Sequence, residues 1–320
     1  MDRKPTAASF LILALAAALL SGATADNLSM IHADRWLAPG ADRVRALGST
    51  RPECLSGGHD PEQSWLIEVG RAAFRTPMLL GGQAARAGLA CESCHQGGRS
   101  NPDFFFPGLS GAPGTADVTS SLFSTHRDDG IDNPRPIPDL SSRGEQDRIA
   151  RYLAGPALEH FIHGQITEEF EGAEPPSAVL KGLASYVRAL SPDACPPEPR
   201  QRLRAETYFG NAQRAVRAAG AALERKDPAT AAFLVQAART QLSLIYERYD
   251  QPASARSRAL LHAASFDLEA AQDAIHAGDP RVGDRLAVWL AQTPGWQSVV
   301  EREEPQSLFN PERLAAAGTH

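Results

Sequence analysis

The sequence predicts a mainly α-helical protein, in which a helical N-terminal domain is followed by an antiparallel helical bundle. Three observations support this prediction. Apolar residues recur at three- and four-residue steps in residues 61–77, 175–190 and 202–292. Asp-Pro pairs interrupt the last of these segments twice, as expected for a helix N-cap followed by the first helical position. Between the first two segments, residues 99–145 are rich in Gly, Pro, Ser and Asp, which predicts a long loop.

The composition is ordinary for a globular protein: 320 residues, 42% apolar and 22% charged, with a formal net charge of -6. A negative net charge gives no electrostatic support for nucleic-acid binding. The length allows about two domains. We expect the following order: a signal peptide at 1–25, an extension at 26–60, a first domain at 61–195, a linker at 196–201, a bundle at 202–292 and a tail at 293–320.

The N-terminus resembles an export signal. Arg3 and Lys4 supply a positive start, and Phe10–Leu20 is an apolar run too short for a stable membrane span. The small residues Ala23–Ala25 suit cleavage before Asp26. An uncleaved membrane anchor is the alternative. We therefore expect an exported, periplasmic protein without a stable membrane span after cleavage.

One short stretch, GLACESCHQGG at residues 88–98, holds two of the four cysteines of the chain. In an exported protein such a pair suits a redox dithiol, half of a zinc site, a disulfide or a haem attachment. Zinc needs about four ligands, and no second Cys or His pair lies nearby. A thioredoxin-like dithiol needs a strand before the motif, which the preceding residues do not predict.

The histidine directly after the second cysteine decides between these possibilities. Cys91-x-x-Cys94-His95 is the c-type haem signature, because it places two thioethers on the porphyrin and an imidazole under the iron. We expect one covalently bound haem c, with Cys91 and Cys94 as attachment sites and His95 as proximal iron ligand. A plain Cys91–Cys94 disulfide is the alternative.

The long loop after the motif contains apolar residues that are candidates for a wall around the haem edge. They are Phe104, Phe105, Phe106, Leu109, Leu122, Phe123 and Ile137. A loop of this length in a compact domain is usually functional.

Residues around the motif resemble a class I cytochrome c domain. Gly70 and Phe74 lie on the first helix, and Tyr186 lies on the last, in the segment LASYVRAL. The resemblance implies that these two helices cross at Gly70, with Phe74 against Tyr186. Together with segments 125–140 and 166–176, the domain is most similar to the haem domains of the di-haem cytochrome c peroxidase family and its relatives that mature amine dehydrogenases.

The resemblance covers about residues 62–192, under half of the chain, and this sequence departs from the family in one respect. Those peroxidases carry two haems, whereas this chain has a single Cys-x-x-Cys-His motif. An electron relay between two haems therefore cannot be built within it. The departure favours an electron carrier over a peroxidase.

The sixth iron ligand is open to several residues. No methionine follows Cys94, which excludes a Met-ligated haem in the usual chain order. His126 fits the family position in the loop and is the expected distal ligand. His160 or His163 on a short helix, Met78, or an open site are the alternatives.

The remaining cysteines flank the domain. Because the first and last helices of a cytochrome c pack together, the resemblance implies that Cys54 and Cys195 lie close to each other. We expect a Cys54–Cys195 disulfide, and two free thiols are the alternative.

The C-terminal segment predicts four helices, near 202–226, 229–250, 253–277 and 280–292. The third has an apolar stripe at helical spacing: Leu261, Ala264, Leu268, Ala271 and Ile275. Short connections imply antiparallel neighbours. The segment has no Glu-x-x-His pair of the di-iron type, and Trp289 and Trp296 suit the core. We expect a structural or docking bundle.

These observations predict an exported mono-haem c-type cytochrome that exchanges electrons with a partner redox protein. Residues 26–196 hold 15 basic and 22 acidic side chains, a difference of -7, which favours a partner with a basic surface. The alternative is a peroxidase-like haem enzyme with a displaceable distal ligand.

Overall fold

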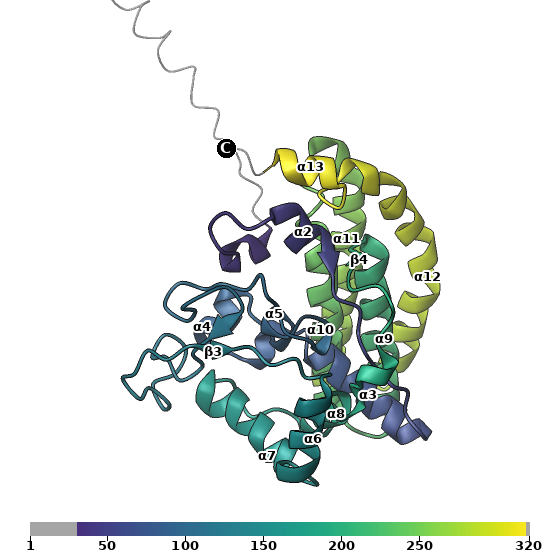
Figure 1. Cartoon of the computed structure of the whole chain (residues 1–320). Helices are drawn as coiled ribbons and strands as arrows, with labels where there is room; N and C mark the ends of the chain where they lie inside the picture. Colours follow the sequence, from purple (N-terminus) through teal and green to yellow (C-terminus); the bar gives the residue numbers. More distant parts are fainter. Residues whose placement is uncertain (1–30, 318–320) are drawn as a thin grey trace, which may run out of the picture.

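The computed structural model describes residues 31–317, so the predicted export signal lies outside the described residues. The chain is mainly α-helical, as predicted. Figure 1 shows the long C-terminal helices standing together, with the shorter helices of the N-terminal half grouped beside them. No helix within residues 31–317 is long and apolar enough to cross a membrane.

The helices of the N-terminal half are mostly short. They are η1 (His32–Trp36), α2 (Arg43–Gly48), α3 (Pro61–Ala73), η2 (Pro77–Leu79), α4 (Gly82–Ala87), α5 (Cys91–Cys94), η3 (Gln96–Gly98), α6 (Arg143–Tyr152), α7 (Ala157–Gly164), the π-helix η4 (Gln165–Glu169), α8 (Ser177–Ala189) and η5 (Pro192–Ala194). Two short antiparallel pairs accompany them: β1 (Ser49–Thr50) with β4 (Gln201–Arg202), and β2 (Thr115–Ala116) with β3 (Arg135–Pro136).

Helix α3 begins where the sequence predicts it. The Asp60 carboxylate accepts a hydrogen bond from the Gln63 amide at 2.8 Å, and Pro61 occupies the first turn, where its missing N–H costs nothing. The helix crosses α8 at a pair of glycines. A Cβ atom added to Gly70 would overlap the carbonyl oxygen of Gly182, so only glycine lets the two backbones approach this closely.

The C-terminal half consists of long helices: α9 (Ala205–Glu224), α10 (Pro228–Tyr246), η6 (Pro252–Ser254), α11 (Ala255–His276), α12 (Val282–Glu303), η7 (Glu304–Gln306) and α13 (Pro311–Ala316). Helix α9 packs against α10 and α12, and α11 packs against the same two helices. This closed arrangement, joined by short turns, is a four-helix bundle. All five positions of the stripe predicted on α11 are buried.

The fourth helix of the bundle is longer than expected. The sequence pattern predicts that this helix ends near residue 292, but α12 continues through Pro294 to Glu303. Trp289 and Trp296 lie on either side of the proline, with ring centroids 5.7 Å apart, and Trp289 is buried as predicted. Packing on both sides of Pro294 keeps the helix continuous although the proline removes one backbone hydrogen bond.

The two halves share one hydrophobic core. Buried residues of α3 and α8, such as Val69 and Leu183, belong to the same cluster as Phe209 and Leu242 of the bundle. The segment 196–201, expected as a linker, leads directly into β4, which pairs with β1. The bundle therefore packs directly against the N-terminal half.

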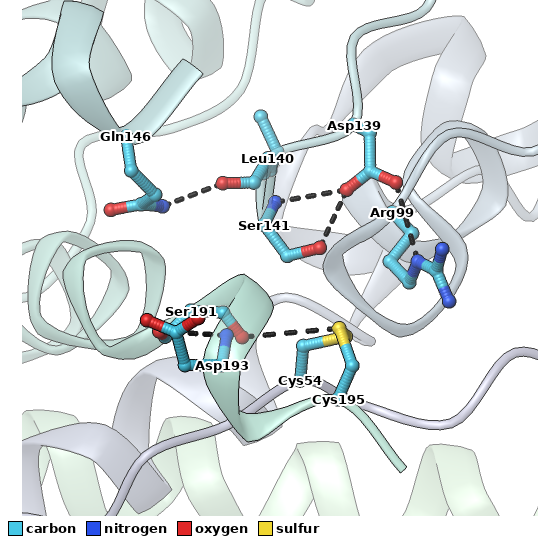
Figure 2. The surroundings of a disulfide bond; sticks show 9 residues. All are labelled: Cys54, Arg99, Asp139, Leu140, Ser141, Gln146, Ser191, Asp193 and Cys195. Atoms are coloured by element: carbon cyan, nitrogen blue, oxygen red, sulfur yellow. Dashed lines mark hydrogen bonds and ion pairs between the residues drawn. A yellow bond between two sulfur atoms is a disulfide. The ribbon is translucent and has the colours of Figure 1, made fainter. Parts of the chain in front are cut away.

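The predicted disulfide is confirmed, because Cys54 and Cys195 are bonded. Figure 2 shows the bond beside Ser191, which lies just after the end of α8. It joins the chain before α3 to the chain after α8, 141 residues apart in sequence. The two flanks meet because the helices next to them cross.

Candidate functional site

The predicted motif forms its own short helix. Helix α5 starts at Cys91 and ends at Cys94, and both thiols are free. The Ser93 hydroxyl accepts a hydrogen bond from the Ala90 amide at 3.1 Å, which fixes the first turn. Residues three and four apart share one face of a helix, so this single turn groups Cys91 with Cys94 and His95.

The glycines after the motif allow a sharp change of direction. Gly97 has a φ of 65°, in the left-handed region that favours glycine. Its backbone also lies close to another segment, since an added Cβ would stand 2.5 Å from the carbonyl oxygen of Arg51. The turn is fixed by the Gly97 amide, which donates to the Glu92 carboxylate at 3.0 Å.

The imidazole of His95 has one anchored nitrogen. Its Nδ1 atom lies 3.1 Å from the backbone carbonyl oxygen of Pro138. A carbonyl can only accept a hydrogen bond, so Nδ1 carries the proton and Nε2 keeps a lone pair. A hydrogen bond of this kind fixes the tautomer and ring orientation of histidines that bind metal through the other nitrogen.

The Pro138 carbonyl belongs to a segment that is fixed in turn. The Asp139 carboxylate accepts from the Ser141 amide at 3.0 Å and the Ser141 hydroxyl at 2.6 Å, and from Arg99 at 3.2 Å. The Gln146 side chain donates to the Leu140 carbonyl at 2.5 Å. Figure 2 shows these contacts gathered around the turn. The resemblance already included segment 125–140 in the domain. The role of the Pro138 carbonyl could not be predicted, because the residue type does not show which backbone carbonyls accept hydrogen bonds.

The surroundings of the motif keep its three side chains uncharged. Burial lowers the pKa of His95 to about 4, although the hydrogen bond to Pro138 opposes the shift. Burial also raises the pKa of both the Cys91 and the Cys94 thiol to about 12. A neutral imidazole is the form that binds a metal ion.

Apolar residues surround the motif. Cys91 and Cys94 pack against a cluster that contains most of the predicted wall: Phe104, Phe106, Leu109, Phe123 and Ile137. Leu122 is exposed and Phe105 lies outside this cluster. On the other side, the Phe74 ring lies 6.4 Å from the His95 ring and 5.0 Å from that of Tyr186, between centroids.

The candidates for a distal ligand lie at or near the surface. The His126 side chain is 69% exposed, with Nδ1 3.6 Å from the Glu171 carboxylate. His160 is exposed, and His163 forms an ion pair of 2.7 Å with Glu174. Met78 is also exposed. The choice of His126 stays a prediction.

The residues present suit a covalently attached haem. They provide two free thiols one helical turn apart, an adjacent oriented imidazole and an apolar surround. Within residues 31–317, no three His, Cys, Asp or Glu side chains are grouped to hold a metal ion by themselves.

Comparison with known proteins identifies no relative. No protein-family model matches the sequence. No curated protein matches it, and no solved structure does.

Proposed function

We propose that this protein is an exported mono-haem c-type cytochrome that transfers electrons to or from a partner redox protein. The observation that carries the proposal is the hydrogen bond between His95 Nδ1 and the Pro138 carbonyl. It orients an imidazole, with Nε2 available, directly beside the free thiols of Cys91 and Cys94.

The helix crossing also supports the proposal. The close approach of α3 and α8 at Gly70 and Gly182, with the Phe74 ring against Tyr186, agrees with the arrangement that the class I cytochrome c resemblance implies. The structure adds Gly182 to the three residues expected from the sequence, Gly70, Phe74 and Tyr186.

Each residue of the site has a defined part. Cys91 and Cys94 would hold the haem through thioethers, and His95 Nε2 would bind the iron. The bound haem would supply a one-electron redox centre. Pro138 orients the imidazole, and the surrounding phenylalanines exclude water.

The confirmed disulfide supports export, because disulfides persist in oxidising compartments such as the periplasm. We place the protein there, after removal of its signal peptide.

The loop after Phe123 suits the contact with the partner. Ile131 is 60% exposed and stands among the exposed carboxylates of Asp128, Asp129 and Asp132. Within residues 31–317 these three carboxylates have no cationic partner in ion-pair range, since no salt bridge involves them. An apolar contact with an acidic rim fits a partner that has a basic surface.

Covalent haem attachment is the first test. The full chain would be expressed together with a c-type cytochrome maturation system and denatured, and haem that stays on the polypeptide would be measured by absorbance and mass. We expect one haem per chain, lost in the Cys91→Ser/Cys94→Ser variant and kept in the Cys54→Ser/Cys195→Ser control. A chain that matures without covalent haem would contradict the proposal.

The spectrum then separates electron transfer from peroxidase chemistry. An electron carrier should give a low-spin, six-coordinate spectrum in both oxidation states and show no reaction with peroxide. A high-spin ferric haem that forms a high-valent species with peroxide would contradict it and favour the enzyme.

The dependence of the electron-transfer rate on ionic strength tests whether the loop with Asp128, Asp129 and Asp132 contacts the partner. Electron transfer with a cationic redox protein should slow steeply as ionic strength rises. The triple variant Asp128→Asn, Asp129→Asn, Asp132→Asn should flatten this dependence. A matched triple variant with the same charge change on α11 and α12, at the exposed Asp267, Asp273 and Asp284, should not.

A further inference from the structure

A cavity of about 230 Å³ lies between helix α5, the segment that precedes α3, and the helices α9 and α10 of the bundle. Its walls include Glu92 and Ser93 of α5, Arg51 after β1, and residues of α9 and α10. Cys91, Cys94 and His95 are not among its lining residues, because they occupy the opposite face of the motif turn. The cavity is therefore not the candidate haem site itself, although it adjoins it, since Trp36 both lines the cavity and belongs to the apolar cluster beside Cys91 and Cys94.

The cavity is rich in positive charge. Five arginines line it, Arg51, Arg71, Arg75, Arg214 and Arg248, together with three carboxylates, Glu53, Glu92 and Asp103. Neutral polar side chains complete the wall, among them Thr207, Asn211, Thr240 and Gln241. Water alone would fill such a space with several molecules, since one water takes up about 30 Å³.

The three carboxylates are already engaged. Glu53 pairs with both Arg71 and Arg75. Glu92 also forms an ion pair with Arg75, at 3.5 Å, although its Oε2 atom has no hydrogen-bond donor among the described residues. Asp103 pairs with Arg45 at 2.5 Å, an arginine that does not line the cavity. None of these carboxylates forms an ion pair with Arg51, Arg214 or Arg248.

The positive charges of the other three arginines, Arg51, Arg214 and Arg248, are not fully balanced by nearby carboxylates. Arg248 is 2% exposed and donates to the Leu47 carbonyl at 2.9 Å, but no carboxylate in residues 31–317 lies in ion-pair range of it. The Arg51 side chain likewise has no ion pair among the described residues. Among the described residues, Arg214 has one carboxylate in ion-pair range, Glu68 at 3.5 Å, and it donates to the Asn211 side chain at 2.5 Å.

Two of these arginines also have an unpaired donor. The Nε atoms of Arg51 and Arg248 are buried and have no hydrogen-bond acceptor, whereas the Nε atom of Arg214 faces the Glu68 carboxylate at 3.5 Å. Burial lowers the pKa of Arg214 to about 10; the charges of Arg71 and Arg75 add to this shift, and those of Glu68 and Glu53 oppose it. Buried donors are nearly always paired, so two unpaired ones on residues that line one cavity indicate a missing acceptor.

We propose that this cavity is a binding site for a small oxyanion, either phosphate or a short-chain carboxylate, held by Arg51, Arg214 and Arg248. Guanidinium groups suit both ligands because their planar N–H donors match carboxylate and phosphate oxygens. The site goes beyond the proposed electron transfer and does not depend on haem.

The test is titration of the full mature chain with inorganic phosphate and with malonate, against chloride at equal ionic strength. Calorimetry and thermal unfolding at low millimolar concentration should show saturable binding and a raised unfolding temperature. Whichever anion binds more tightly identifies the ligand class. No saturable binding of either anion would overturn the proposal.

Variants locate the site. Arg51→Gln and Arg214→Gln should each weaken binding at least tenfold. Arg217→Gln is the matched control, because Arg217 lies three residues further along α9 and is exposed. Unchanged affinity in both cavity variants would overturn the proposal. Should neither variant fold, a crystal structure of the parent protein with phosphate decides, since anion density outside the cavity alone would contradict it.

Discussion

The Nδ1 atom of His95 lies 3.1 Å from the carbonyl oxygen of Pro138, a residue 43 positions further along the chain. This contact joins the short motif helix to the end of the long loop. It makes the orientation of the imidazole depend on how firmly the turn at Pro138 is held. Asp139, the next residue, holds that turn through Ser141 and Arg99.

Asp139→Ala should therefore loosen the turn. The change removes the acceptor of the Ser141 and Arg99 hydrogen bonds, and we expect the free energy of unfolding to fall by about 2 kcal/mol in urea titrations. In the haem-loaded protein it should also shift the reduction potential, which a purely structural role would leave unchanged.

Two further variants control this prediction. Asp139→Asn keeps one oxygen acceptor for Ser141 and should fall between the parent and Asp139→Ala. Asp193→Ala breaks only a pair between two exposed side chains, Asp193 and Arg143, and should change stability by less than about 1 kcal/mol. Equal effects of Asp139→Ala and Asp193→Ala would contradict the argument.

Gly70→Ala should separate α3 from α8. The added methyl group would overlap the carbonyl oxygen of Gly182, a backbone atom that cannot move without displacing a helix. We expect a loss of at least about 3 kcal/mol in the free energy of unfolding, measured by urea titration.

Gly220→Ala is the matched control for that substitution. Gly220 lies within α9, and an added Cβ meets nothing within 4 Å. Because alanine is the better helix former, this change should stabilise the protein by about 0.5–1 kcal/mol. A similar loss in both variants would mean that the helix crossing is not the cause.

Much of the fold could be predicted because it follows from local patterns. Asp60 with Pro61 marks the start of α3, and Asp227 with Pro228 marks that of α10. The end of α12 could not, since continuation through Pro294 depends on tertiary packing of Trp289 and Trp296. The shared core of the two halves could not be predicted for the same reason. An apolar stripe indicates that one face of a helix is buried, but not which other helix covers it.

The ion-pair network around Glu53 makes stability depend on pH. Burial alone would raise the pKa of Glu53, but the charges of Arg75 and Arg71 outweigh it and lower the pKa from 4.5 to about 2. A carboxyl group with a depressed folded-state pKa stabilises the fold above its unfolded value. This contribution, on the order of 3 kcal/mol, should be lost as pH falls from about 4.5 to about 2.

The variant Glu53→Gln tests whether the charge of Glu53 causes this dependence of stability on pH. The variant should unfold at lower urea than the parent at pH 7, and the gap between the two should narrow as pH falls from about 4.5 to about 2. Glu62→Gln breaks a solvent-screened pair with Arg225 and should follow the parent curve. A gap between the parent and Glu53→Gln that is constant with pH would show that Glu53 does not act through its charge.

The candidate site, like the fold, could be predicted in part. Cys91, Cys94 and His95 could be proposed as site residues from the sequence, because their motif is contiguous. The Pro138 carbonyl and the arginine cavity could not, since both are assembled from segments far apart in the sequence. Arg51 and Arg248, for example, are almost 200 residues apart and carry no motif.

Spectroscopy of the haem-loaded protein tests whether His126 is the distal ligand. The loop around it is fixed by hydrogen bonds, since the Ser124 hydroxyl accepts from the His126 amide at 3.0 Å and Thr125 donates to Glu171 at 2.6 Å. If His126 is the distal ligand, His126→Ala should change the spectrum of the reduced protein and raise its potential, because the nitrogen ligand is lost. His160→Ala and His163→Ala test the alternative ligands in the same way, and His262→Ala on α11 is the control. An unchanged spectrum and potential in His126→Ala would rule out the assignment, and a change in His160→Ala or His163→Ala alone would transfer it to that residue.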